Sequence, residues 1–446
     1  MINDKLSSRP YSWVPSLYLA EALPYVAVMV IATTMYKRMG LTNTELAFYT
    51  SWLYLPWVIK PLWSPFIASV RTERWWVLAM QLLIGAGFAG IALTLPTDGW
   101  LRGSLAFFWL LAFASATHDI AADGLYIIGL DTHDQSLYVG IRSTFYRIGN
   151  IVGQGLLVML AGWLEGRGSI PAAWSITFYV LAAAFIALWL WHCVALPKAS
   201  RTAPTADGTG AYITTPDASP SDSGHTEHGS ALWLALKTFF SKPHLLSALL
   251  FMLLFRFPEG QLVKIANPFL LDGTDHGGLA MSTEAVGFVY GTVGIIGLTL
   301  GGLLGGWCVA GSGLKRWLWP MVAAISLPDI VYVFLAMAAP QLTAMSPQMS
   351  TLIVSTCVFI EQFGYGFGFT AYMLFLVYFS QGERSTAVFS ICTALQALGM
   401  MLPGMIAGWM ADTLGYVGFF LWVCGCCAVT FLVSAFIHID PTYGKR

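Results

Sequence analysis

Twelve long apolar stretches, most of them separated by short polar turns, constrain this chain more than any other feature of its sequence. A helix needs roughly 20 mainly apolar residues to cross the hydrocarbon core of a bilayer. The stretches that meet this length are 11–36, 44–70, 75–96, 102–128, 139–164, 171–196, 244–271, 283–310, 315–339, 347–379, 384–411 and 415–438. Only 10% of the residues are charged, against about 25% in soluble domains, so there is too little polar surface for a water-soluble particle. The sequence predicts an all-α polytopic membrane protein with 12 transmembrane helices.

One connection differs from the others in length and composition. Residues 197–243 are rich in Thr, Ser, Ala, Pro, Gly and Asp, and such a segment buries too little apolar surface to fold. It divides the predicted spans six and six. We therefore expect an N-terminal six-helix bundle over 1–196, a cytoplasmic disordered linker over 197–243 and a C-terminal six-helix bundle over 244–446.

The loops carry an uneven distribution of basic residues, which predicts the orientation. If both termini face the cytoplasm, the loops on that side hold 14 Lys and Arg, and the opposite loops hold only Lys37, Arg38, Arg102 and Arg167. Cytoplasmic loops of membrane proteins carry the excess of basic residues. We expect a multi-pass protein of the cell inner (cytoplasmic) membrane with both termini in the cytoplasm.

Composition also excludes several kinds of partner. The net charge of −1 argues against nucleic acid, and no Walker-type phosphate-binding loop for ATP is present. All seven cysteines lie in apolar runs without metal-ligand spacing, so we expect neither a metal nor a cofactor. The expected partners are a small-molecule substrate, protons and membrane lipid, and we expect a monomer.

Ten Asp, Glu, Lys and Arg residues lie well inside the predicted spans, away from the span ends. Each costs about 2.5–3.5 kcal/mol near the bilayer centre, so ten would cost roughly 25–35 kcal/mol, more than a typical folding free energy. They must therefore face a polar interior and pair or carry protons. The acids outnumber the cations by two: Glu21, Asp119, Asp123, Glu259, Asp329 and Glu361 against Lys60, Arg147, Arg256 and Lys264.

In spans 4 and 5, polar residues recur at helical spacing. Asp119 and Asp123 share one face of span 4, which Tyr126 continues. Because two carboxylates this close repel, one of them is expected to hold a proton. Arg147 lies on one face of span 5 together with Asn150 and Gln154, and we expect it to pair with the two aspartates.

Spans 7 and 10 carry a second set of polar residues. Arg256 and Glu259 flank a Pro/Gly break in span 7, which predicts a binding site because a broken helix exposes backbone groups. Lys264 and Asn267 follow on the same helix. In span 10, Glu361, Tyr365 and Tyr372 form one stripe beside Gln362, which suits a polar ligand with flat or sugar-like faces, although a Tyr stripe also serves core packing.

These residues and their neighbours resemble known families. The glycine-rich stretch that runs from Gly301 to the basic pair Lys315-Arg316 is similar to the cytoplasmic loop of the major facilitator superfamily. A longer series of motifs resembles AmpG-type permeases, a branch of its peptide/acetyl-CoA transporter group. The matching residues are Leu23-Pro24, Lys60-Pro61-Leu62-Trp63-Ser64-Pro65, Ala116 to Asp123, Tyr146-Arg147-Ile148-Gly149 with Val152 and Gly155, Phe255-Arg256 with Glu259, Glu284 to Gly287, Glu361 with Gly366, Gly368 and Ala371, and Ala407-Gly408-Trp409.

The resemblance implies a secondary active transporter that imports anhydro-muropeptides (GlcNAc-anhydroMurNAc with or without peptide) from periplasm to cytoplasm by proton-coupled symport and alternating access. The proton-coupling candidates are Asp119, Asp123, Glu259, Glu361 and Glu21. The substrate-binding candidates are Lys60, Arg147, Asn150, Gln154, Arg256, Lys264, Asn267, Gln362, Tyr25, Tyr126, Tyr365 and Tyr372.

Two alternatives remain open at this point. Asp123 is followed by Gly124-Leu125-Tyr126 without the lysine typical of the family, and Arg256 replaces a second lysine, so the same fold with another polar cargo such as a siderophore stays possible. The other alternative is a prenyltransferase-like membrane enzyme that holds magnesium diphosphate with Asp119 and Asp123. Such a site needs a second aspartate-rich segment, which the C-terminal half does not offer.

Overall fold

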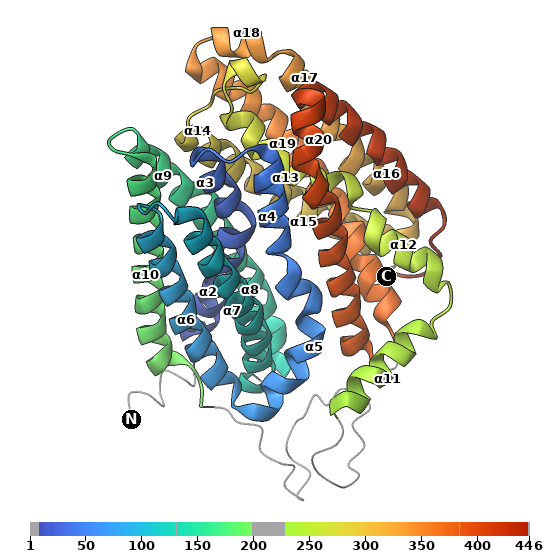
Figure 1. Cartoon of the computed structure of the whole chain (residues 1–446). Coiled ribbons are helices and arrows are strands. Elements are labelled where there is room, and N and C mark those ends of the chain that lie inside the picture. Colours follow the sequence, from blue (N-terminus) through green and yellow to red (C-terminus); the bar gives the residue numbers. More distant parts are fainter. Residues whose placement is uncertain (1–8, 131, 199–227, 383, 445–446) are drawn as a thin grey trace, which may run out of the picture. The chain divides into compact units, whose positions relative to one another are not determined.

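The computed structural model describes residues 9–130, 132–198, 228–382 and 384–444, and within these ranges every regular element is a helix (Figure 1). Most of the predicted linker lies outside the described residues. Its last part forms α11 (His228–Phe240), which buries Ala235 and Phe239 while Lys237 stays exposed. Such one-sided burial is typical of an amphipathic helix that packs on its neighbours.

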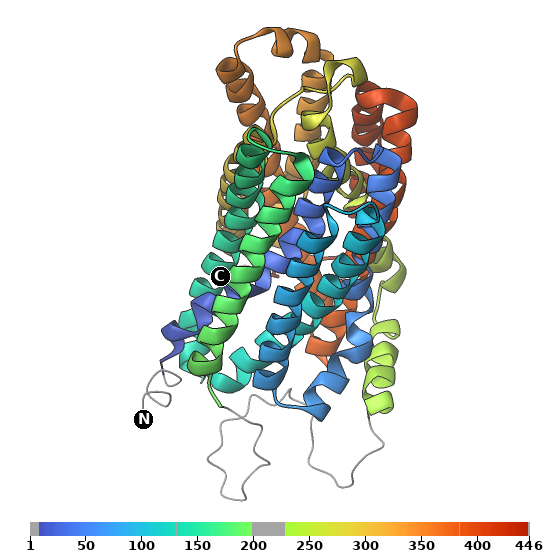
Figure 2. The ribbon, with the colours of Figure 1, turned by 60° about the vertical axis from the view of Figure 1, so that its left-hand side comes forward.

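The helices of the sequence up to residue 198 follow the predicted order. They are η1 (Pro10–Ser12), α2 (Val14–Val26), η2 (Ala27–Ile31), α3 (Ala32–Arg38), α4 (Asn43–Trp52), α5 (Leu55–Val70), α6 (Glu73–Thr94), α7 (Trp100–Gly129), α8 (Thr132–Ile151), η3 (Val152–Leu157), α9 (Val158–Glu165) and α10 (Ile170–Ala195). Here α6 packs against both α7 and α10 (Figure 2).

After α11 the chain continues as helices to residue 435. They are α12 (Leu245–Leu254), α13 (Phe257–Leu271), η4 (Thr274–His276), α14 (Thr283–Phe288), η5 (Val289–Gly294), α15 (Ile295–Ser312), α16 (Leu314–Ser326), η6 (Leu327–Asp329), α17 (Ile330–Met337), α18 (Ala339–Ala344), α19 (Pro347–Ser380) and α20 (Ser385–Ala435).

Ten helical stretches among the described residues are long and apolar enough to cross a membrane. Two local features explain why the number is ten although twelve spans are predicted. A turn at Leu53 and Tyr54 divides the second predicted span into α4 and α5, which are each too short to qualify. The helix α20 contains the last two predicted spans, which meet at Gly415, where φ is 66° and ψ is 169°. Each predicted span therefore has a helical counterpart.

Several spans contain a local irregularity. The predicted Pro/Gly break in span 7 is confirmed, because α12 ends at Leu254 and α13 starts at Phe257, with Pro258 in its first turn. Proline lacks the N–H group that would continue the preceding helix. The elements η2, η3 and η5 are single π-helical turns, which often mark functional sites.

The chain forms two compact units whose limits differ from the sequence halves. Unit 1 comprises Met1–Met29, Ile59–Gly153 and Leu164–Leu232, and unit 2 comprises Val30–Val58, Gln154–Trp163 and Trp233–Arg446. Unit 2 thus contains α3, α4 and most of α9 in addition to the helices of the C-terminal half. Two of the limits fall inside the π-turns η2 and η3, and a third lies one turn after the α4–α5 break. The bundles expected from the sequence, 1–196 and 244–446, stay a prediction.

Candidate functional site

In unit 1, the two aspartates of α7 each face a cation from another helix. Asp119 forms an ion pair with Lys60 of α5, and Asp123 accepts from Arg142 of α8 at 2.8 Å. The Lys60 and Asp119 side chains are 24% and 22% exposed, and those of Arg142 and Asp123 are 33% and 38% exposed. Partial exposure keeps both pairs within reach of water, so their protons and partners can exchange.

The prediction that Arg147 pairs with these two aspartates is wrong. Arg142 takes that place, and it also packs over the rings of Tyr18 and Tyr126, at 4.5 and 5.4 Å from their centroids. Five residues turn a helix by about 140° beyond one full turn, so Arg142 and Arg147 point in different directions from α8. Within the described residues, Arg147 forms no ion pair with either aspartate, and its side chain is half-buried.

A third acid of unit 1 completes this group. Glu21 of α2 is buried and interacts directly with Asp119, carboxyl to carboxyl. Two carboxyl groups form a hydrogen bond with each other only when one of them carries a proton. Tyr18, one turn before Glu21, donates to Asp123 at 3.1 Å. We call Glu21, Asp119, Asp123, Lys60 and Arg142 the N-terminal charge cluster, in which three acids face two cations.

In unit 2, three further acids lie in a more enclosed setting. Glu259, Asp329 and Glu361 are 6%, 3% and 2% exposed. Glu361 lies within electrostatic range of both other acids. Its carboxylate accepts from Gln362 at 3.0 Å and from Tyr332 at 3.4 Å. We call these three carboxyls the C-terminal acid cluster.

The partners of this second cluster are mostly neutral. Cys427 donates to one oxygen of Asp329 at 3.4 Å, and the other oxygen is buried without a hydrogen-bond partner. Glu259 interacts with Arg256, three residues earlier at the helix break. The Arg256 guanidinium also donates to the Tyr365 hydroxyl and lies 4.8 Å from the centre of the Phe369 ring. A cation held against aromatic faces is a favourable arrangement for binding a planar anionic group.

Tyr372, one of the predicted binding residues, lies in the apolar interior of unit 2. Its side chain is fully buried, its hydroxyl donates to the Met252 carbonyl at 2.6 Å, and its ring stacks on Phe251 and Phe255. The prediction that Tyr372 contacts a ligand does not fit this placement, because the ring is part of the aromatic core. The stripe on α19 therefore splits between Tyr365, which contacts Arg256, and Tyr372 in the core.

The other candidates are placed as follows. Lys264 donates to Thr50 at 3.0 Å, and Asn267 donates to Thr34 at 3.3 Å, both within unit 2. Asn150 is half-buried with an unpartnered side-chain oxygen, and Gln154 is half-buried in η3. Tyr25 is half-buried on α2, and Tyr126 donates to the backbone carbonyl of Gln135.

Sequence reasoning missed Arg142 of the N-terminal charge cluster and Tyr18, which donates to that cluster. Tyr18 lies at i−3 from Glu21, so its helical face offered a signal. Arg142 offered none, since it reads as a basic residue near the end of a span. A buried chain of hydrogen bonds was also missed: His192 bonds Ser16 and Gln81 at 2.9 Å each, and Gln81 bonds His118 at 3.0 Å. This chain links α2, α10, α6 and α7 next to Asp119.

Comparison with solved structures defines the class of protein. The nucleoside transporter NupG superposes with a TM-score of 0.70 at 14% identity and covers 96% of this chain and 99% of its own. The D-xylose-proton symporter superposes with a TM-score of 0.68 at 13% identity, covering 98% and 99%. The predicted fold, that of the major facilitator superfamily, is confirmed, and the chain is a multi-pass membrane protein.

Comparison with curated proteins narrows the resemblance. The chain is 24% identical over 371 residues to the anhydromuropeptide permease of Escherichia coli K12, which covers 82% of this chain and 67% of the relative. A Rickettsia conorii protein named as a transporter, AmpG 4, is 23% identical over 416 residues, 91% of each chain. No protein-family model matches. The predicted similarity to AmpG-type permeases is confirmed, and the chain is a transporter of a small molecule, not an enzyme.

Proposed function

We propose that this chain is a proton-coupled symporter that imports anhydro-muropeptides, GlcNAc-anhydroMurNAc with or without peptide, from periplasm to cytoplasm by alternating access. The observation that carries the coupling is the N-terminal charge cluster. Its two ion pairs engage Asp119 and Asp123 and leave the Glu21 carboxyl without a cation of its own, next to Asp119.

An uncompensated carboxylate inside a membrane is costly, so a proton neutralises the extra acid. The proton leaves only when the surroundings change, for example when a ligand binds or when water gains access from the other side. Partial exposure of Asp119 and Asp123 provides the route to water. One proton that crosses 100 mV supplies about 2.3 kcal/mol, enough for roughly fiftyfold accumulation.

The C-terminal acid cluster and its neighbour Arg256 are proposed to contribute less to proton coupling and more to cargo binding. Glu259 and Glu361 are also coupling candidates, but both are almost completely buried, which gives them fewer routes to water. Arg256, which contacts both Tyr365 and Phe369, is our first candidate to bind a cargo carboxylate beside a sugar ring. Lys60 and Arg147 are further candidates for the carboxylates, and Asn150, Gln154 and Gln362 for amides and hydroxyls.

The proposed cargo is taken from the name of a relative of this chain. The Escherichia coli relative is named anhydromuropeptide permease, and its similarity to this chain extends over 82% of this chain. We further propose that the protein lies in the inner membrane with both termini in the cytoplasm, in line with the distribution of Lys and Arg in the loops. We also propose that it is a monomer.

The test is uptake of radiolabelled GlcNAc-anhydroMurNAc, with and without peptide, into proteoliposomes with an imposed inward proton gradient. We expect accumulation that an uncoupler abolishes. If vesicles that hold folded protein take up none of these compounds, the proposed cargo is refuted, and siderophores would be the next candidates. Uptake that equilibrates without accumulation would contradict the coupling.

A further inference from the structure

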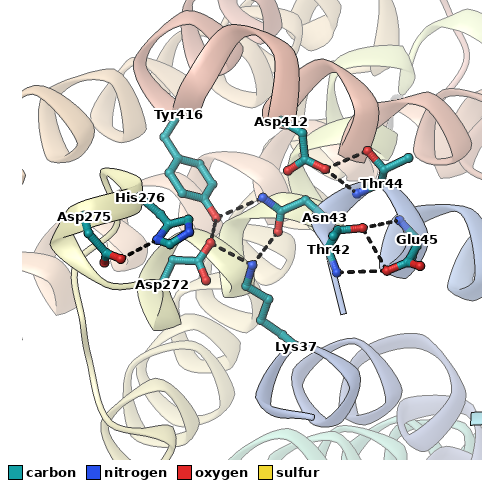
Figure 3. Close-up of polar contacts among 10 residues, drawn as sticks. All are labelled: Lys37, Thr42, Asn43, Thr44, Glu45, Asp272, Asp275, His276, Asp412 and Tyr416. Carbon is teal, nitrogen blue, oxygen red and sulfur yellow. Dashed lines mark hydrogen bonds and ion pairs between the residues drawn. The ribbon is translucent and has the colours of Figure 1, made fainter. Parts of the chain in front are cut away.

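Unit 2 joins two parts of the chain that are far apart in sequence through a polar network at one end of its helices (Figure 3). Lys37, at the end of α3, forms an ion pair with Asp272 at 2.7 Å and donates to Asn43 at 2.8 Å. Asn43, at the start of α4, donates to the Tyr416 hydroxyl at 3.2 Å, and this hydroxyl donates to Asp272. The four side chains close a ring. We call Lys37, Asn43, Asp272 and Tyr416 the outer latch.

A second contact fixes the start of α4 to α20. Asp412 accepts from the Thr44 backbone N–H at 2.8 Å and from its hydroxyl at 2.6 Å. Thr42 and Glu45 cap the same helix with reciprocal hydrogen bonds (Figure 3). The start of α4 is therefore capped, and it is bound to α20 through a charged acceptor.

Polar contacts continue from the latch along α13. Asn267 donates to Thr34 of α3, and Lys264 donates to Thr50 of α4. Lys264 and Asn267 lie about one turn apart on α13, and Asp272 caps the end of this helix five residues after Asn267. The helix thus forms hydrogen bonds to both α3 and α4.

Close backbone contacts accompany these hydrogen bonds. A Cβ atom at Gly408 would clash with the backbone of Asn43, and one at Gly291 would clash with the backbone of Gln154. Gly408 is among the motif residues that carry the family resemblance. Glycine at such positions lets two helices approach closely and separate again without disturbing packed side chains.

We propose that the outer latch holds the periplasmic side of the transporter closed in the conformation described here, and that it must open in each cycle for cargo to enter. The proposal rests on the proposed function and on the predicted orientation, which places these loops outside. The latch residues come from both sequence halves, as a contact that breaks during alternating access requires. The α3–α4 segment connects to unit 1 through η2 and through α5 just beyond its break, where the backbone is irregular.

The chemistry of the latch suits reversible opening. The Lys37 and Asp272 side chains are 11% and 17% exposed, so neither is fully enclosed, and both line a pocket through which water can reach the ion pair. A pocket of about 410 Å³ lies against the latch and is lined by Lys37, Asn43, Asp272, His276, Asp412 and Tyr416, among others. Ala411, which also lines this pocket, is 3% exposed and reports whether the pocket widens.

The test measures how fast a membrane-impermeant maleimide labels Ala411→Cys in the purified full-length protein, after subtraction of labelling of the native cysteines. Asp272→Asn removes the latch charge, and we expect labelling to rise roughly tenfold, the factor given by about 1.4 kcal/mol. Asp275→Asn is the matched control, since it makes the same change three residues away at an exposed acid that pairs with His276. It should leave labelling unchanged.

The charge-swapped variant Lys37→Asp with Asp272→Lys should return labelling toward the parent rate, because it restores the ion pair with its polarity reversed, and an unchanged thermal unfolding temperature of Asp272→Asn shows that the single variant folds. Equal labelling of the parent, Asp272→Asn and Asp275→Asn would overturn the latch. This readout needs no cargo. A latch that behaves as expected in a protein that takes up no muropeptide would therefore refute the cargo alone.

Discussion

The two groups of intramembrane carboxyls in this transporter are built in opposite ways. In the N-terminal charge cluster, Asp119 and Asp123 face cations and are partly exposed. In the C-terminal acid cluster, Glu361 accepts hydrogen bonds from an amide and a phenol, and it is almost completely buried. The first arrangement can change its protonation when the site opens to water. The second is stable chiefly when its carboxyls are neutral, since three buried charges of one sign would repel.

This difference indicates which cluster couples transport to proton movement and which one chiefly stabilises the fold. An acid that exchanges its proton needs both a stabilised charged form and access to water. Asp119 has both, through Lys60 and its exposure, whereas Asp329 has a thiol donor and an unpartnered oxygen. Substitutions that remove a single carboxyl from one or the other cluster therefore test the comparison directly.

The largest effect is expected for Asp119→Asn. The change removes the partner of Lys60 and the acceptor of Glu21, so the cluster no longer has a carboxyl in excess of its cations. Accumulation driven by a proton gradient should fall from up to roughly fiftyfold to simple equilibration. Counterflow exchange of labelled for unlabelled cargo, measured in the same vesicles, should persist. Gradient-driven accumulation in this variant would remove Asp119 from the coupling.

Arg142→Ala should come next. It leaves Asp123 with only the Tyr18 hydroxyl, and loss of one partner of a partly exposed pair costs about 1–2 kcal/mol. We expect a lower unfolding temperature and weaker accumulation. Arg147→Ala is the matched variant on the same helix: it should keep the stability of the parent and raise KM for a carboxylate-bearing cargo. Equal destabilisation by both variants would contradict the assignment of Arg142 as the partner of Asp123.

Glu361→Gln should have a smaller effect on coupling. Glutamine has nearly the shape of a protonated glutamate and can still accept from Tyr332. Accumulation should therefore fall less than threefold, about 0.7 kcal/mol, in the assay used for Asp119→Asn. A complete loss of accumulation with exchange retained would reverse the comparison and place the coupling in the C-terminal acid cluster.

The smallest effect on transport is expected for Gln81→Leu. This glutamine bridges His192 and His118 behind the N-terminal charge cluster, and its loss leaves His118 without this hydrogen bond and His192 with Ser16 alone. An unsatisfied buried polar group costs about 1–3 kcal/mol, so thermal unfolding should begin at a lower temperature. Uptake per folded molecule at a temperature well below unfolding should stay near the parent value. A strong loss of coupling without loss of stability would give the histidine chain a part in proton movement.

The sequence could predict what depends on spacing along one helix. The apolar stretches located the spans, the four-residue interval located Asp119 and Asp123 on one face, and Pro258 located the break in span 7. It could not predict contacts that depend on how neighbouring helices are rotated. Arg142 and Arg147 are both basic residues on α8, and only the rotation of α8 selects Arg142. Tyr365 and Tyr372 share a stripe, yet their neighbours place one beside Arg256 and the other in the core.

The limits of the compact units were also beyond sequence reasoning. The linker suggested a division near its own position, whereas α3 and α4 pack with helices of the C-terminal half. This packing depends on the close contact between Gly408 and Asn43 and on the latch, whose contacts between the two sequence halves join residues more than 200 positions apart. No local pattern reports such a contact.

The most direct test of the central claim is proton movement that accompanies cargo. GlcNAc-anhydroMurNAc is added to proteoliposomes that contain a pH-sensitive dye, at zero initial proton gradient and with the membrane potential clamped. Cargo entry should acidify the lumen in the parent protein and in Arg147→Ala at saturating cargo, and it should not do so in Asp119→Asn. Cargo entry into the parent without any change in lumenal pH would contradict proton coupling by the N-terminal charge cluster.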